Sequence, residues 1–149
     1  TMTSRKTVMR LLALAPAPLL ESALQKDLPA VRARGCKLIR KPETGLIMAR
    51  GRISGTGSPF NVGEVLVTRC AVSLTGGQTG YAWILGADSD HARDAALLDA
   101  LWQDPECGPF LERELLPAMQ KAVEEKRAAR VKRAAGTRVN FFTMVRGED

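Results

Sequence analysis

The sequence predicts an α+β domain in which an antiparallel meander of about four strands packs against N-terminal and C-terminal helices. Apolar residues recur at helical spacing in residues 3–15 and 18–28. Short apolar segments separated by Gly and Pro then fill residues 36–85, and helical spacing resumes after residue 88. With 149 residues, of which 45% are hydrophobic and 26% charged, the chain fits one globular domain spanning residues 1–149.

The first two elements are short helices. Val8, Leu11 and Ala15 share one helical face, and Pro16 ends that run. Pro18 suits the first turn of a second helix, which Pro29 follows.

Four segments are expected as strands, at residues 38–39, 46–54, 62–74 and 80–85. In the second segment two sets of side chains alternate along the strand. The set expected to be buried is Ile47, Ala49, Gly51 and Ile53, and the set on the opposite face is Met48, Arg50 and Arg52. In the third segment Leu66, Cys70, Val72 and Leu74 share one face, and Val65, Val67 and Arg69 share the opposite face. The glycines of residues 75–79 predict a tight hairpin before the fourth segment.

Asp88 is expected to cap a helix that reaches residue 102. A longer helix is expected at residues 109–135, with a kink or break at Pro117. The apolar segment after it, residues 139–145, favours either a terminal core strand or docking into another subunit. Phe141, Phe142 and Met144 are therefore candidate interface residues on a partner-docking arm of residues 136–149.

Charge and cysteine content limit the classes of protein. The net charge is +6, with basic residues 1–83 and 115–149 flanking an acidic stretch at residues 84–114. No cysteine pair has zinc or disulfide spacing, so reduced thiols in a cytoplasmic protein are expected. No apolar stretch reaches the roughly 18 residues of a membrane span.

One cluster suits negatively charged oxygens. Arg50, Arg52 and Arg69 on neighbouring strands, beside the loop that holds Gly55 and Gly57, are candidates for contact with substrate phosphates. The loop is not a P-loop, because it lacks the Gly-Lys-Ser/Thr end and precedes a strand. The alternative is a solvated strand face beside an ordinary glycine turn.

No catalytic residue is assigned. His91 is the single histidine, and the isolated chain is not expected to hold a Ser or Cys hydrolase triad. For His91 itself, catalysis or metal binding competes with a capping or packing role. The sequence gives no metal site. The basic residues 121–133 contain no aromatic residue, which favours a solvated or partner-facing helix over nucleic-acid binding.

Several segments resemble the PhnG family, and in the same order. These are Glu43-Thr44-Gly45-Leu46, Gly55-Thr56-Gly57, the residues between Gly63-Glu64 and Thr68-Arg69, Gly80-Tyr81-Ala82-Trp83-Ile84-Leu85-Gly86, His91-Ala92, Leu98-Asp99-Ala100-Leu101, and the C-terminal Arg138-Val139-Asn140-Phe141-Phe142-Thr143-Met144-Val145-Arg146-Gly147. The resemblance covers residues 43–147, whereas the N-terminal helices and residues 121–135 are similar in character only.

The resemblance implies a subunit of the carbon–phosphorus lyase machinery of organic phosphonate catabolism. Such a subunit would act with PhnH, PhnI and PhnL in forming α-D-ribose 1-methylphosphonate 5-triphosphate from ATP and methylphosphonate, with release of adenine. It would also join PhnH, PhnI and PhnJ in a core assembly, with ATP and Mg as substrate and metal of the complex and no cofactor in this chain. The isolated chain is then expected to be inactive, and a contact between two copies is open. The alternative is a basic module that binds nucleotides or nucleic acid by itself.

Overall fold

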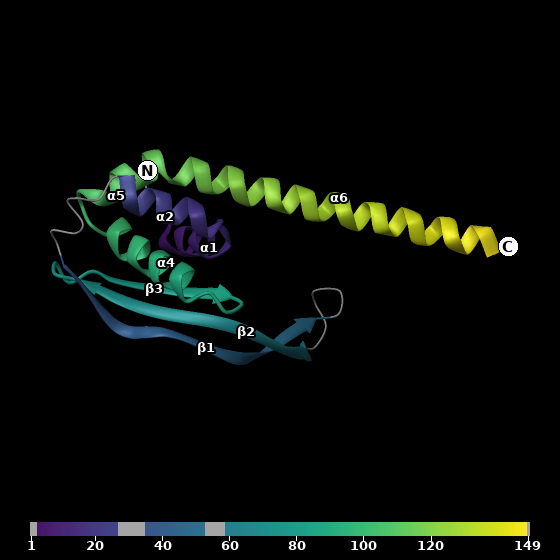
Figure 1. Cartoon of the computed structure of the whole chain (residues 1–149), viewed down its shortest axis with the longest axis horizontal. Coiled ribbons are helices and arrows are strands. Elements are labelled where there is room, and N and C mark those ends of the chain that lie inside the picture. The colour runs from purple at the N-terminus through teal and green to yellow at the C-terminus, as the bar shows by residue number, and fades with distance from the viewer. Residues whose placement is uncertain (1–2, 27–34, 53–58, 149) are drawn as a thin grey trace.

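The computed structural model describes residues 3–26, 35–52 and 59–148, with side chains for all of these except residues 26, 49–52, 59–62 and 136–148. The elements in order are α1 (Arg5–Leu14), α2 (Ala17–Lys26), β1 (Cys36–Arg52), β2 (Pro59–Leu74), β3 (Thr79–Leu85), α4 (Ser89–Trp102), α5 (Cys107–Glu114) and α6 (Leu116–Glu148). In Figure 1 the sheet forms one layer. The helices other than α6 are stacked on one side of the sheet, and α6 runs far beyond them. The predicted α+β class is confirmed.

Both predicted N-terminal helices are present. Ser4 caps α1, since its Oγ accepts a hydrogen bond from the Thr7 amide at 3.3 Å. The chain leaves helical geometry at Ala15, directly before Pro16. Leu12 of α1 and Leu20 of α2 are fully buried, so both helices contribute to the core.

Glu112 of α5 ties the start of the chain to the helical layer. One carboxylate oxygen accepts hydrogen bonds from both the amide and the hydroxyl of Thr3, and the other accepts one from the Trp102 indole at 2.9 Å. Burial alone would raise the pKa of Glu112, but the hydrogen bonds from Thr3 and Trp102 lower it below its ordinary value. The ionised carboxylate therefore stabilises this corner of the fold.

Among the described residues the sheet has three antiparallel strands in the order β1-β2-β3, whereas the sequence analysis expected about four. The first two expected segments are one strand, β1. Pro42 does not end it, because it falls at an irregularity in the register between Arg40, opposite Ala71, and Glu43, opposite Arg69. An edge strand tolerates such a residue, since the missing N–H removes no ladder bond.

The expected hairpin between β2 and β3 is confirmed. Leu74 donates its amide to the Gln78 carbonyl at 2.8 Å, and Gly77 adopts a φ of 93°, which residues with a side chain rarely adopt.

Helix α4 lies directly on the inner face of β3. A Cβ at Gly80 would stand 1.9 Å from the Ala96 carbonyl oxygen, so only glycine permits this approach. Asp99 of α4 is fully buried, and it accepts hydrogen bonds from the Tyr81 amide at 2.9 Å and the Arg5 guanidinium at 3.0 Å. This carboxylate therefore joins α4, β3 and α1.

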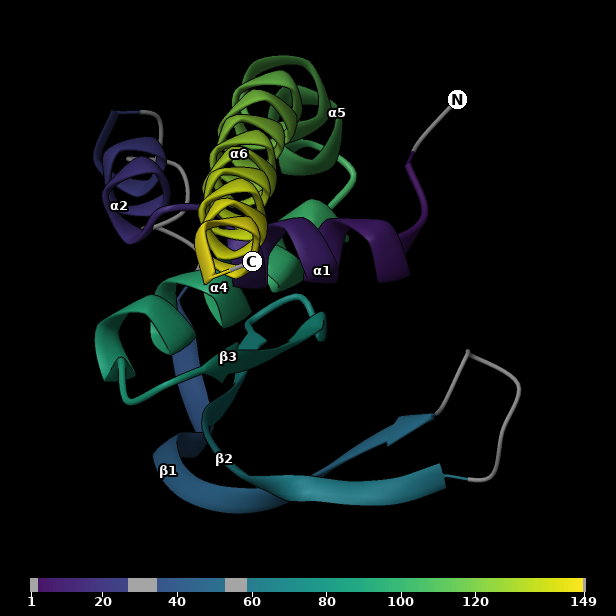
Figure 2. The same ribbon diagram turned by 90° about the vertical axis from the view of Figure 1, so that its right-hand side faces the viewer.

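The expected burial of Ile47 is wrong. Ile47 remains 38% exposed, and its neighbours Leu46 and Met48 are exposed as well. Leu66 lies on the same strand face as the buried Cys70 yet is exposed too, because the helices do not extend over this part of the sheet, as Figure 2 shows. Strand alternation correctly placed Leu66 on the face of Cys70, but it did not reveal where the helical layer stops. It placed Ile47 on the wrong face, because Ile47 lies opposite Val65, which shares the face of Arg69 that points away from the helices.

The C-terminal half differs from expectation in its boundaries. Asp88 caps α4 as predicted, accepting a hydrogen bond from the His91 amide at 3.0 Å. The expected helix at residues 109–135 is two helices that meet at Leu115, and Pro117 stands in the first turn of α6, where its missing N–H costs nothing. α6 continues to Glu148, so the terminal strand considered for residues 139–145 is wrong: their backbone is helical.

Within the described ranges, no single helix is long and apolar enough to span a bilayer. The bent pair α1 and α2 meets that criterion only jointly. Leu11, Leu12 and Leu20 of that pair are buried in the core.

Candidate functional site

The face of the sheet that points away from the helices is the main candidate surface. Along β3, Ala82 and Ile84 face α4, so the side chains between them face outward. These outward residues are large, and Trp83 and Leu85 remain 53% and 72% exposed. We call this side of the sheet the outer face.

A charged and aromatic cluster occupies the middle of the outer face. The Arg69 guanidinium of β2 stacks over the Trp83 ring, 5.9 Å from its centroid, and lies 3.7 Å from the Glu43 carboxylate of β1. Arg40 joins the same carboxylate at 3.2 Å. The cluster borders a shallow hollow of about 180 Å³ that Ile47 and Leu46 extend toward the end of the sheet.

Beyond β3 the sheet continues as a two-stranded ribbon. β3 pairs only with residues 67–73 of β2, so the part of β2 before Val67 is paired with β1 alone. Leu46, Met48 and Leu66 are exposed there. A ribbon of two strands is marginal in water by itself, which suits a segment covered by another protein.

The large apolar side chains that remain exposed are concentrated on the sheet. Among the described residues they are Leu38, Ile39, Leu46, Ile47, Met48, Leu66, Tyr81, Trp83 and Leu85, all on strands, and Val131 on α6. Extended apolar patches of this kind mark interaction surfaces, and Trp, Tyr and Arg are the side chains most often found as their anchors.

The three arginines predicted as a phosphate site lie at different points along the sheet. Arg69 stands opposite Glu43, whereas Arg50 is seven residues further along β1, about 23 Å of extended strand. Arg52 is further still, and the side chains of Arg50 and Arg52 lie outside the described residues. Gly55 and Gly57 also lie outside them. The described Arg69 is already paired and stacked, so the shared phosphate site stays a prediction.

Phe141, Phe142 and Met144 fall within the last turns of α6, as does the rest of the proposed docking arm of residues 136–148. Their side chains lie outside the described residues. Their role as interface residues therefore stays a prediction.

His91 has a packing role. It is buried in the first turn of α4, and its ring Nε2 lies 2.9 Å from the Leu12 carbonyl oxygen, which makes that nitrogen the donor and links α4 to α1. Within residues 3–26, 35–52 and 59–148, no group of three or more His, Cys, Asp or Glu side chains is placed to hold a metal ion.

Trp83 was not predicted as a surface residue, although its strand carries a signal for it. Along β3, the small residues Gly80 and Ala82 alternate with Tyr81 and Trp83. Small residues permit close helix packing on one face, which leaves the aromatic residues to the other.

A sheet that helices cover on one side and that bears apolar and aromatic side chains on the other defines this chain as a component of a larger assembly. The family model described as "Phosphonate metabolism protein PhnG" matches residues 3–147. The α-D-ribose 1-methylphosphonate 5-triphosphate synthase subunit PhnG of Rhizobium meliloti (strain 1021) is 46% identical over 113 residues, which cover 74% of this chain and 70% of the relative. The chain belongs to the PhnG family.

Proposed function

We propose that this chain is a subunit of an α-D-ribose 1-methylphosphonate 5-triphosphate synthase. It acts with PhnH, PhnI and PhnL in a reaction in which methylphosphonate replaces the adenine of ATP on the ribose. The observation that carries this proposal is the 46% identity to a synthase subunit over 113 residues, within a family match that spans residues 3–147.

The contribution of this subunit is assembly. Its described residues do not fit a metal, and its one histidine ring is engaged in packing, so they offer neither a metal-activated water nor a free imidazole base. Any Mg accompanying ATP would be held by the nucleotide and other subunits. The outer face and the ribbon supply surface for a cytoplasmic core assembly with PhnH, PhnI and PhnJ.

Omission assays test the function. The chain is co-expressed with the other synthase subunits, and adenine release from ATP and methylphosphonate is followed with each subunit left out in turn. We expect release only when this chain is present, restored by adding the purified chain, and none from the chain alone. Undiminished release without the chain would contradict the proposal, as would turnover by the chain alone. Binding of oligonucleotides at physiological salt, with no effect on the synthase, would instead favour a stand-alone basic module.

A further inference from the structure

A hollow of about 560 Å³ lies where α6 leaves the body of the domain. Its walls come from the end of α1 and the turn into α2, the end of β3, the first turn of α4, and α6. Small-molecule sites in proteins measure roughly 300–1,000 Å³, so this hollow has the size of a ligand site. It shares only Trp83 with the hollow at the middle of the outer face.

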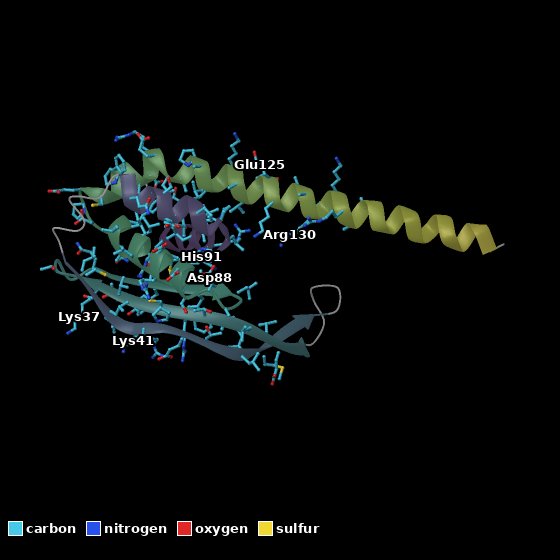
Figure 3. The ribbon with its side chains drawn as sticks, viewed as in Figure 1. Lys37, Lys41, Asp88, His91, Glu125 and Arg130 are labelled. Atoms are coloured by element: carbon cyan, nitrogen blue, oxygen red, sulfur yellow. The ribbon has the colours of Figure 1, made fainter. Side chains whose placement is uncertain are left out.

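The stripe of α6 that faces this hollow changes from apolar to basic along the helix. Met119 is fully buried and Val123 half-buried, and the next positions at helical spacing are Lys126 and Arg130. Both line the hollow. Figure 3 shows Arg130 on the side of α6 nearer His91, with Glu125 on the other side. The face of α6 that packs on the domain through Met119 and Val123 therefore presents two cations further along the helix.

Arg10 of α1 adds a third cation from the opposite wall. The ion pairs among described residues include none made by Arg10, Lys126 or Arg130. Among the described residues Asp88 is the one carboxylate in the lining, and it already caps the first turn of α4. Three cations with no acidic partner in the described part of the chain, facing one carboxylate across a concave surface, produce a positive potential there.

The remaining lining is largely apolar. The His91 ring is held by its hydrogen bond to the Leu12 carbonyl, and Leu14, Pro16, Trp83 and Leu85 contribute to the walls. Apolar walls of low dielectric focus the potential of the cations on a bound anion.

We propose that this hollow binds the tetrahedral oxyanion groups, phosphate or phosphonate, of a small-molecule ligand, held by Arg10, Lys126 and Arg130. Guanidinium and ammonium groups form charge-assisted hydrogen bonds with such oxygens. The binding site itself follows from the described geometry, whereas the identity of the natural ligand rests on the proposed synthase function. An acidic segment of a partner protein is the competing occupant.

Titration of the full-length chain by calorimetry tests the proposal, with inorganic triphosphate, ATP and methylphosphonate as separate ligands at low salt. We expect saturable binding of triphosphate. Arg10→Gln, Lys126→Gln and Arg130→Gln should each weaken it about tenfold, the loss of one charge-assisted contact. Arg127→Gln is the matched control, because Arg127 neighbours Lys126 but pairs with Glu124 at 3.1 Å.

A substitution that strengthens binding is also available. Asp88→Asn keeps an oxygen able to cap α4 and removes the one negative charge in the lining. We expect it to tighten triphosphate binding several-fold with the melting temperature nearly unchanged. Saturable binding of ATP without binding of triphosphate would assign recognition to the base and overturn the oxyanion site. Binding of methylphosphonate would identify a phosphonate as the group that the site holds.

Three further results would overturn the proposal. The first is no saturable binding of either triphosphate or methylphosphonate, and the second is an equal loss in Arg127→Gln, which would show attraction to a basic helix in general. The third is weaker assembly in the cation variants without any triphosphate binding, which would assign the hollow to an acidic protein segment. Each is separable from failure of the proposed function, since the omission assays for adenine release do not depend on this site.

Discussion

Replacing Trp83 by Ala separates docking from folding, because Trp83 is on the outer face and its neighbour Ile84 is in the core. In the free chain the change removes the stacked Arg69 contact, about 0.5–1 kcal/mol for an exposed pair, or roughly 1–4 °C in melting temperature. Covering the exposed 53% of the side chain buries about 130 Å² on assembly. At about 25 cal/mol per Å², that burial contributes about 3 kcal/mol to docking.

Ile84→Ala is the matched control. Ile84 is 3% exposed beneath α4, so its truncation should destabilise the free chain by about 2–5 kcal/mol. Thermal melting measures the loss of stability in the free chain. Co-purification with the synthase subunits across a concentration series measures the loss of docking. Trp83→Ala should weaken co-purification on the order of 100-fold while melting nearly normally. Normal co-purification with a strongly lowered melting temperature would refute the docking role of the outer face.

Three further predictions concern the rest of the chain. Gly80→Ala should destabilise the fold by about 3 kcal/mol or more, seen in chemical denaturation, because its Cβ would stand 1.9 Å from a carbonyl oxygen of α4; a change under about 1 kcal/mol would contradict this packing. Glu112→Gln should lower stability near neutral pH by about 1 kcal/mol, and because the folded pKa of Glu112 is lowered, the difference should vanish as pH falls through that pKa; a difference constant with pH would show that the charge is irrelevant. Phe141→Ala and Phe142→Ala should each weaken co-purification by about 2 kcal/mol with little change in melting of the free chain, and the reverse pattern would place both residues in the domain's own core.

Local chemistry predicted most of the elements. Proline correctly placed the end of α1 and the start of α2, Asp88 correctly placed the start of α4, and glycines correctly placed the β2–β3 hairpin. Pro42 was misread as a strand break, because its effect depends on whether the strand lies at an edge. That property belongs to the sheet and not to the segment.

The exposed surfaces depended on tertiary contacts that no local pattern contains. Ile47 alternates as a buried residue would, but the strand register sets it opposite Val65, on the face of the sheet that points away from the helices. Likewise, Lys126 and Arg130 appear in the sequence as part of a solvated charged helix. Only their spacing from Met119, together with the position of α1, places them over a hollow.

Oxidative footprinting of the chain, alone and within the assembled synthase, tests most directly whether the outer face and ribbon are the docking surface. Hydroxyl radicals modify exposed Trp and Met side chains, so Trp83 and Met48 report on the outer face and the ribbon, and the buried Met119 serves as reference. We predict that both modification rates fall several-fold on assembly while that of Met119 stays low. An active assembly in which Trp83 and Met48 are modified as fast as in the free chain would contradict the docking role of the outer face and the ribbon.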